Sequence, residues 1–404
     1  MKPAPDRTLF WLAAASFASM ASMRICDPML PALASDFGVA AAAASGVVTL
    51  YAIGYGVSQL AHGPLGDRIG KARYIAGAAL AAALASLLCA LAPGLAALEL
   101  ARLLTGSIAA AIIPLSMAWV GDTVPYGQRQ ASLAKFLNGT ILGAILGQAM
   151  GGILADTLGW RAAFVILAGI FALSGWMLRR VVLAGAPAGE VAAATAATAA
   201  TASPAAPAPG ALARYGIVLR SGWARTILVI VGIEGLLAFG PLAFVPTSLH
   251  ERAGLPVWIA GATVAAFGLG GLAYTANAAR LVNRLGESGL ALAGGALMAS
   301  GFALLAVAPW SGVLACILLG LGYHMLHNTL QTHATQMAPT VRGTGVALFA
   351  MCLFIGQSAG VTLAAQVVLA AGFVPVFAGA AAGVLATGAS FALLLQRRVG
   401  TKIE

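Results

Sequence analysis

The stretch Gly63-Pro-Leu-Gly-Asp-Arg-Ile-Gly-Lys-Ala-Arg73 separates two long apolar segments, 44–65 and 74–92. Glycine lets the chain turn sharply and lets two backbones approach closely, so the stretch predicts a tight connection between two helices. An aspartate such as Asp67 is stabilised beside a helix N-terminus, and basic residues by acidic groups or lipid head groups. The candidate working residues of this connection are Gly63, Asp67, Arg68, Gly70, Lys71 and Arg73.

The composition around this stretch indicates an integral membrane protein. Of 404 residues, 60% are hydrophobic and only 8% are charged, against about 25% charged residues in a soluble domain. This imbalance excludes a soluble enzyme, a nucleic-acid binder and a disordered chain. The long unbroken apolar runs indicate helices, because a membrane β-barrel would show segments of about ten residues with alternating polarity.

Twelve apolar segments are long enough to cross a hydrocarbon core about 30 Å thick, which requires about 20 residues. They fall at 9–32, 44–65, 74–92, 96–121, 133–155, 162–180, 226–248, 257–280, 289–308, 312–337, 344–370 and 374–395. With twelve spans and an internal N-terminus, 18 basic residues fall on the cytoplasmic side and 2, Arg161 and Arg252, on the other. This asymmetry predicts a multi-pass protein of the cell inner (plasma) membrane with both termini in the cytoplasm.

The chain divides into six spans plus six around residues 181–224. The middle of that segment is rich in Ala, Thr, Pro and Gly, cannot form a core, and predicts a flexible cytoplasmic linker. We therefore expect one six-helix bundle in 1–180 and a second in 225–404. A degraded copy of 63–70 recurs at 279–286, and related positions stay 213–216 residues apart. Such a repeat indicates two pseudo-symmetric bundles with a transport site between them.

Several motifs resemble the major facilitator superfamily. The stretch 63–73 matches that family's GxLaDRxGrk signature at nearly every position, and the resemblance extends over the whole chain. It implies an all-α integral membrane fold of twelve transmembrane helices, arranged as two pseudo-symmetric six-helix bundles. Asp27-Pro-Met-Leu-Pro31, Arg102-Leu-Leu-Thr-Gly106 and the glycines of the fifth span look like motifs of the twelve-helix drug:proton antiporters. Gln148 departs from that pattern, since the antiporters have a proline in its position.

The fifth span carries a glycine at every fourth position from 139 to 151, which makes a smooth stripe on one helix face. Such stripes let membrane helices pack closely. We expect helix packing from Gly143, Gly147, Gly151 and Gly152. Because the family fold brings helices 5 and 8 together, we also expect these glycines at the interface where the halves rock. Gln148 would add a polar group there that hydrogen bonds another helix.

Four ionisable residues stand out inside the predicted spans as candidates for function: Arg24, Asp27, Arg102 and Glu234. A charge near the bilayer centre costs about 2.5–3.5 kcal/mol, so each one needs a partner or a function. Asp27 and Arg102 lie at matching depth and predict a carboxylate–guanidinium pair, which Arg24 would share. This pair is either a structural tie between helices 1 and 4 or a switch that opens when Asp27 takes a proton. Glu234 lies in mid-span without a local cation, which suits either proton or substrate binding or a structural hydrogen bond.

The tenth span carries a polar stripe. His324, His327 and Gln331 stand at i, i+3 and i+7, on one helical face. Histidine binds and releases protons near neutral pH and also ligates soft metals. The stripe predicts cavity lining, hydrogen bonds between helices or metal transport. The resemblance places helices 1, 4, 7 and 10 around a central cavity, so these groups and the ionisable residues would face one space.

The sequence contains no nucleotide-binding loop, no catalytic nucleophile motif and no Cys-x-x-Cys pair. We therefore expect no enzymatic activity, no cofactor and no bound metal. The prediction is a secondary transporter, a monomer among membrane lipids, that exports a small organic compound or drug in exchange for protons by alternating access. Two alternatives stay open: a proton-coupled importer of a small metabolite, and a membrane-embedded sensor or lipid-modifying protein on a transporter scaffold.

Overall fold

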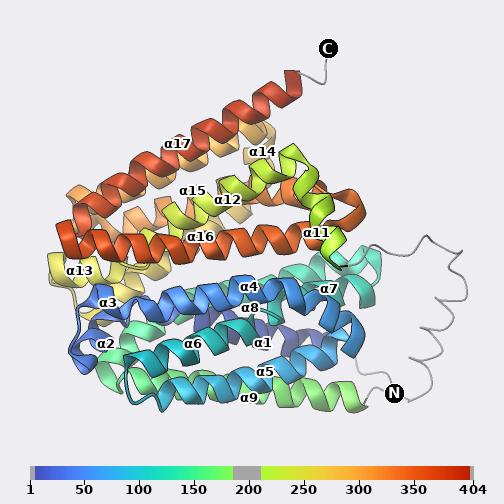
Figure 1. Ribbon diagram of the computed structural model, residues 1–404, viewed down its shortest axis with the longest axis horizontal. Coiled ribbons are helices and arrows are strands. Elements are labelled where there is room, and N and C mark those ends of the chain that lie inside the picture. Colours follow the sequence, from blue (N-terminus) through green and yellow to red (C-terminus); the bar gives the residue numbers. More distant parts are fainter. Residues whose placement is uncertain (1–4, 185–210, 401–404) are drawn as a thin grey trace, which may run out of the picture.

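The computed structural model describes residues 5–184 and 211–400, and this part of the chain consists of helices joined by short turns. Figure 1 shows two layers of helices, the first built from α1 to α9 and the second from α12 to α17. The first half contains α1 (Pro5–Arg24), α2 (Leu30–Phe37), α3 (Ala41–Ala44), α4 (Gly46–Ile69), α5 (Lys71–Ala90), α6 (Leu95–Ala109), α7 (Ile112–Thr123), α8 (Tyr126–Thr157) and α9 (Trp160–Ala184). The helices that follow are α11 (Ala211–Arg220), α12 (Gly222–Leu242), α13 (Val245–Ala253), α14 (Val257–Val307), α15 (Gly312–Gln336), α16 (Arg342–Ala371) and α17 (Phe373–Gly400).

The described residues supply the predicted twelve spans. Ten helical segments are long and apolar enough to cross a membrane. One of them, α14, has 51 residues and would be about 75 Å long as a straight helix, more than twice the thickness of the hydrocarbon core. It is interrupted at Gly286, whose φ of 62° is left-handed, and therefore contributes two spans. α1 and the first residues of α2 cover the predicted segment 9–32 and make one further span, so that the total is twelve.

The first span of each half is broken near a proline. Proline lacks a backbone N–H and disfavours helical backbone in the residue before it. Pro28 lies between α1 and α2, and Pro241 lies one residue before the end of α12, where the chain turns into α13. The two prolines are 213 residues apart, which is within the offset of the repeat. The breaks are therefore a shared feature of the two halves.

The glycine stripe of α8 packs within the first half. A Cβ on Gly143 or Gly147 would collide with the backbone of α1, and a Cβ on Gly151 with the backbone of Ile25, directly after α1. In the second half, Gly356 and Gly360 of α16 lie equally close to the backbone of α12. The predicted repeat thus appears in three dimensions as equivalent helix packing.

This packing corrects the expectation that the whole stripe lies between the halves. Residues four apart share one helix face, and that face of α8 is turned toward α1 rather than toward the second half. Gly152, about 100° further round the helix, does face the second half, because a Cβ there would meet the backbone of Val257 and Trp258 in α14.

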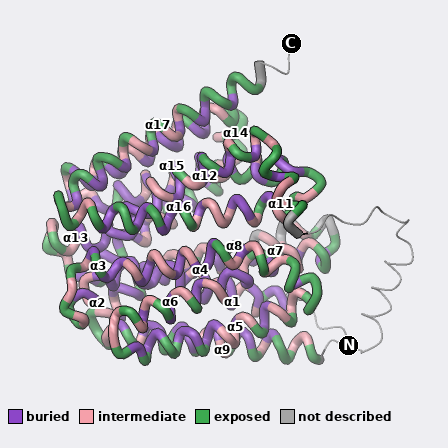
Figure 2. Tube along the Cα trace, viewed as in Figure 1, coloured by how far each residue is buried: buried purple, intermediate pink, exposed green. Residues whose placement is uncertain are grey.

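The outer surface of the helices is apolar. Leu84 and Leu100, for example, expose 67% and 64% of their surface. Figure 2 shows buried residues where helices face one another and exposed residues along their outward sides. An apolar exterior over helices whose backbone groups are satisfied internally is what a lipid environment requires.

The predicted linker, 181–224, is described only at its two ends. Residues 181–184 complete α9, and 211–220 form α11, after which Ser221 caps the N-terminus of α12. The expectation of a flexible connection for 185–210 lies outside the described residues.

Candidate functional site

A cavity of about 300 Å³ lies between the two halves. Side chains from α1 and α8 line it on one side, and side chains from α12, α14, α15 and α16 on the other. Most of the lining is apolar or aromatic, as Met20, Ile145, Phe239 and Phe267 illustrate. The polar side chains of the lining are Arg24, Thr140, Gln148, Tyr323, His324 and His327.

Asp27 lies behind this lining, in the turn that breaks the first span. Its side chain is completely buried. Its Oδ2 accepts a hydrogen bond of 3.1 Å from Nε2 of Gln148 and lies 3.7 Å from Nη1 of Arg24. Its Oδ1 has no hydrogen-bond partner among the described residues. Asp27 does not line the cavity itself, but it contacts Gln148 and Arg24, which do.

Arg102 does not pair with Asp27, contrary to the sequence-based expectation. It is fully buried and donates hydrogen bonds to the backbone carbonyls of Ser22 and Val47, at 2.9 and 3.2 Å. Its guanidinium lies 4.0 Å from the centre of the Tyr51 ring. Equal depth along two helices does not determine the direction in which a long side chain points, and here that direction is toward carbonyls of α1 and α4. Arg102 thus ties three helices of the first half together.

Glu234 has a partner that its own helix does not supply. Its Oε2 lies 2.8 Å from Nδ1 of His327 in α15, and its Oε1 has no partner among the described residues. Only 1% of Glu234 is exposed, whereas His327 lines the cavity. Because a carboxyl group and an imidazole can both hold a proton, one proton can be shared across this contact.

The predicted stripe of α15 divides between two environments. His324 lines the cavity and lies 2.7 Å from the carbonyl oxygen of Gly320 through its Nδ1. Gln331 is exposed and does not line the cavity. Two helical turns separate it from His324, so a shared face does not bring both side chains to the same depth.

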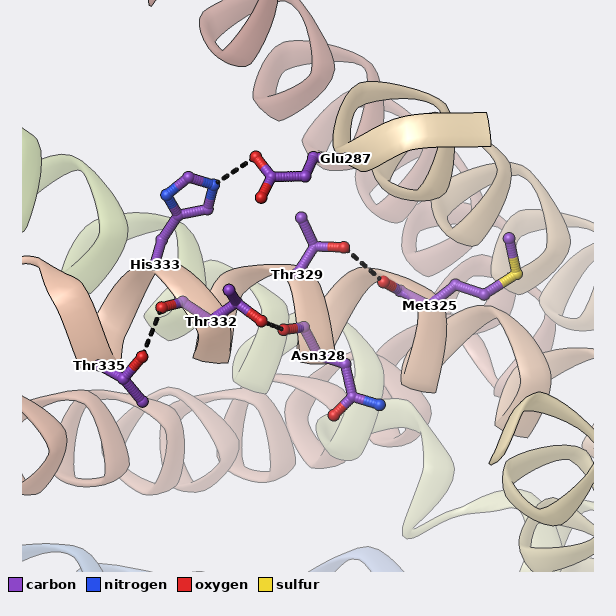
Figure 3. Close-up of polar contacts among 7 residues, drawn as sticks. All are labelled: Glu287, Met325, Asn328, Thr329, Thr332, His333 and Thr335. Atoms are coloured by element: carbon purple, nitrogen blue, oxygen red, sulfur yellow. Dashed lines mark hydrogen bonds and ion pairs between the residues drawn. The ribbon is translucent and has the colours of Figure 1, made fainter. Parts of the chain in front are cut away.

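Beyond His327, the threonines of α15 donate hydrogen bonds within their own helix, and His333 contacts α14 (Figure 3). Thr329 and Thr332 donate to carbonyl oxygens four residues earlier, at 2.9 and 2.8 Å. His333 lies 3.1 Å from Glu287 of α14 through its Nε2. This part of the helix therefore makes a second glutamate–histidine contact, outside the cavity, where half of the glutamate side chain is exposed.

Two aromatic residues, Phe239 and Tyr323, connect the two buried carboxyl groups, although the sequence analysis did not single them out. The guanidinium of Arg24 lies 4.2 Å from the centre of the Phe239 ring, and that ring lies 4.9 Å from the ring of Tyr323. Tyr323 in turn stacks on His327 at 4.8 Å. In the sequence both residues resemble ordinary apolar packing positions, so no signal there marks them.

The stretch 63–73 forms the ends of two helices rather than a loop. α4 continues to Ile69 and α5 begins at Lys71, so Gly70 alone joins them, with a φ of 93° that favours glycine. Nζ of Lys71 lies 2.9 Å from Asp67 and 2.6 Å from Asp122. The other basic residues of the stretch, Arg68 and Arg73, are exposed. In this state Asp67 is therefore tied within the first half.

The two ends of the molecule differ. We call the end at which α1 begins and α17 ends the terminal end, and the end that carries α2, α3 and α13 the distal end (Figure 1). At the distal end the halves are hydrogen bonded: Asp156 accepts from the backbone N–H of Trp258 at 2.9 Å, and Ser358 donates to the carbonyl of Thr49 at 3.1 Å.

Toward the terminal end the halves enclose a second hollow of about 880 Å³. Asp67, Lys71 and Pro114 line it from the first half, and Gln336 and Arg342 from the second. The halves are therefore joined at the distal end and separated by a hollow at the other.

Comparisons with known proteins agree with this architecture. Fatty acid resistance protein FarB of Neisseria gonorrhoeae is 30% identical over 179 residues, which are 43% of this chain and only 35% of that relative. Putative multidrug resistance protein MdtD of Pectobacterium atrosepticum is 27% identical over 406 residues, 90% of this chain and 87% of the relative.

Among solved structures, a bacterial homologue of the human lysosomal transporter Spinster, in an inward-facing and unoccupied conformation, superimposes with a TM-score of 0.72 at 16% identity and covers 97% of both chains. The sequence profile of the Major Facilitator Superfamily matches residues 12–361. The chain belongs to the Major Facilitator Superfamily of membrane transporters.

Proposed function

We propose that this transporter exports small, mainly apolar organic compounds in exchange for protons. The observation that supports the proposal best is the pair of buried carboxyl groups, one in each half, behind a single cavity. Asp27 contacts Gln148 and Arg24, Glu234 contacts His327, and each carboxyl group has one oxygen without a described partner. Protonation of either group would change its contacts and thereby the polar wall of the cavity.

The energetics of the bilayer favour such a coupling. A charge that loses its partner inside the membrane costs several kcal/mol. Asp27 should therefore separate from Arg24 only when it takes up a proton and loses its charge. The same holds for Glu234 and His327. A proton that enters from the more acidic side would therefore alter the cavity in both halves, and a compound that binds to one protonation state would be released from the other.

The cavity lining supports an apolar substrate class. Met20, Ile145, Phe239 and Phe267 offer dispersion contacts, and the described lining contains no acidic side chain. The names of two relatives, a multidrug resistance protein and a fatty acid resistance protein, point in the same direction. We infer a neutral or weakly acidic compound with a large apolar part.

Alternating access between two states follows from the same arrangement. We infer that the terminal end faces the cytoplasm of the inner membrane, because basic residues gather there and only Arg161 and Arg252 fall at the other end. The structure would then be the inward-facing state, with the distal hydrogen bonds closing the outer side. We infer a monomeric unit, since the cavity lies between the two halves of one chain.

Import is a second candidate, and Gln148 favours it. The antiporters that the sequence resembles have a proline in this position, whereas Gln148 here contacts Asp27. In import a small metabolite would move in the same direction as the protons, whereas in export the compound moves against them.

Transport by reconstituted protein tests the proposal. Radiolabelled chloramphenicol and dodecanoate would be the probes, with a pH gradient imposed in either direction across the vesicle membrane. Exchange predicts accumulation of at least one probe against the proton gradient, and loss of that accumulation in Asp27→Asn and Glu234→Gln. Glu251→Gln, a change at an exposed carboxylate of α13, is the matched control. Gradient-driven accumulation at wild-type rates in both Asp27→Asn and Glu234→Gln would refute the residue assignment. Movement of a probe in the same direction as the protons would favour import.

A further inference from the structure

Gln148 is the residue that contacts the buried carboxyl group of Asp27 most directly. We propose that Gln148 is a positioning residue, which holds Asp27 in its ionised form and so sets the pH at which Asp27 takes its proton during transport. The role of Asp27 as a proton carrier rests on the function proposed above. The hydrogen bond from Gln148 to Asp27 does not depend on that function.

The geometry of the contact favours ionised Asp27. Nε2 of Gln148 donates to Oδ2 of Asp27 at 3.1 Å, and the two side chains are 5% and 0% exposed. A hydrogen bond donated to a carboxylate stabilises the charged form, because the ionised oxygen is the stronger acceptor. Gln148 is the closest side-chain donor to Asp27 among the described residues, since Nη1 of Arg24 lies 3.7 Å from the same oxygen.

The remaining groups around Asp27 do not replace this contact. Arg24 of α1 lies at 3.7 Å, beyond the usual length of a hydrogen bond. Arg102 of α6 is directed toward carbonyl oxygens of α1 and α4. Cys26 precedes Asp27 on the same turn, and α14 approaches through Gly261, which carries no side chain. Arg24 and Arg102 therefore attract the carboxylate through space, and the directed contact comes from Gln148.

The backbone under Gln148 is held firmly. Gly147 of α8 lies against the backbone of α1, and Gly151 lies against Ile25 and Pro28 in the turn that follows α1, both with no room for a side chain. This close packing fixes the distance between α8 and the turn that carries Asp27. Gln148 also lines the cavity, whereas Asp27 does not. A bound compound that displaces the amide would therefore change the state of Asp27 without touching it.

Infrared difference spectroscopy of the purified full chain tests this inference without any substrate. The C=O stretch of protonated Asp27 is assigned by its absence in Asp27→Asn, and its intensity is followed against pH. In Gln148→Leu the midpoint moves upward by about one pH unit, since a hydrogen bond to a charged group is lost. The pH profile of transport moves in the same direction. Thr140→Val, which removes a buried hydroxyl from the same helix and the same cavity, leaves the midpoint unchanged.

Gln148→Glu keeps the size of the side chain and serves as the second variant if Gln148→Leu does not fold. A carboxylate in place of the amide raises the midpoint of Asp27 further, because two like charges oppose each other. An unchanged midpoint in the folded Gln148 variants would overturn the inference. A shifted midpoint in a protein that shows no gradient-driven transport would leave the inference standing and refute the proposed function, so the two failures are distinguishable.

Discussion

The contact between Glu234 and His327 yields a quantitative prediction about the energy of a buried pair. Replacing His327 with leucine leaves a carboxyl group inside the second half with neither oxygen hydrogen bonded. Replacing Glu234 with leucine leaves only the imidazole of His327 at the cavity wall. The double variant puts two apolar side chains in place of the pair.

The magnitudes follow from the burial of Glu234. Removing one partner of a buried charged pair costs about 3–5 kcal/mol, whereas apolar replacement of both partners is often neutral or stabilising. A hydrogen bond that involves a charged group contributes about 1.5–3 kcal/mol. We therefore expect His327→Leu to be the more destabilising single change, the double variant to be less destabilised than it, and a coupling energy of about 2 kcal/mol.

Glu287 and His333 provide a matched control within the same chain (Figure 3). This pair has the same two side-chain types and a similar separation of 3.1 Å, but 53% of the Glu287 side chain is exposed. Exposed pairs contribute about 0–1 kcal/mol. Double-mutant cycles on both pairs, measured by reversible unfolding in mixed micelles, separate the effect of burial from that of residue type.

Two results would refute this reasoning. One is equal coupling in the two pairs, which would mean that burial does not strengthen the Glu234 contact. The other is a His327→Leu variant as stable as the wild type, which would mean that the carboxyl group tolerates the loss of its partner.

Three further predictions concern the first half. Gly143→Ala should lower the melting temperature markedly, because its Cβ would collide with the backbone of α1, whereas Gly169→Ala, in open space on α9, should not; equal melting temperatures would contradict the packing. Arg102→Met should cost about 1–3 kcal/mol of stability through lost hydrogen bonds yet leave transport dependent on pH, because Arg102 attracts Asp27 only through space; loss of the pH dependence would instead indicate a pair with Asp27. Hydrogen bonds from Trp160 and Arg161 lower the pKa of Asp36, which is exposed at the distal end beyond the apolar segment 9–32. Because the folded pKa lies below the unfolded one, the stabilisation exists above about pH 4 and disappears as the pH falls through the folded value. Asp36→Asn should therefore lower the melting temperature more at pH 7 than at pH 3. An equal lowering at the two pH values would contradict a stabilising role of ionised Asp36.

The architecture was predictable because hydropathy and repeats act over whole segments. Twenty apolar residues specify a span whatever their order, and Pro28 and Pro241 mark the same break in both halves. Gly286 shows how a single residue with left-handed backbone divides 51 helical residues into two spans. Such features depend on local chemistry, which the sequence contains.

The contacts of the site were less predictable. The sequence identified Asp27 and Glu234 as buried carboxyl groups, but a position along a helix specifies depth and not the direction of a side chain. The predicted partner Arg102 points toward carbonyl oxygens, and Gln148, expected to hydrogen bond another helix at the interface between the halves, contacts Asp27. The partner of Glu234 comes from α15, 93 residues away in sequence, and only the packing of the second half brings the two together.

Proton release on ligand binding tests the central claim most directly. Chloramphenicol, which does not titrate near neutral pH, is added to the purified protein in a weakly buffered solution with a pH indicator. The exchange mechanism predicts that binding expels protons from the wild type and none from a variant that carries both Asp27→Asn and Glu234→Gln. Equal proton release by the wild type and by that variant, with the same binding of chloramphenicol, would contradict the claim that these two carboxyl groups carry the protons.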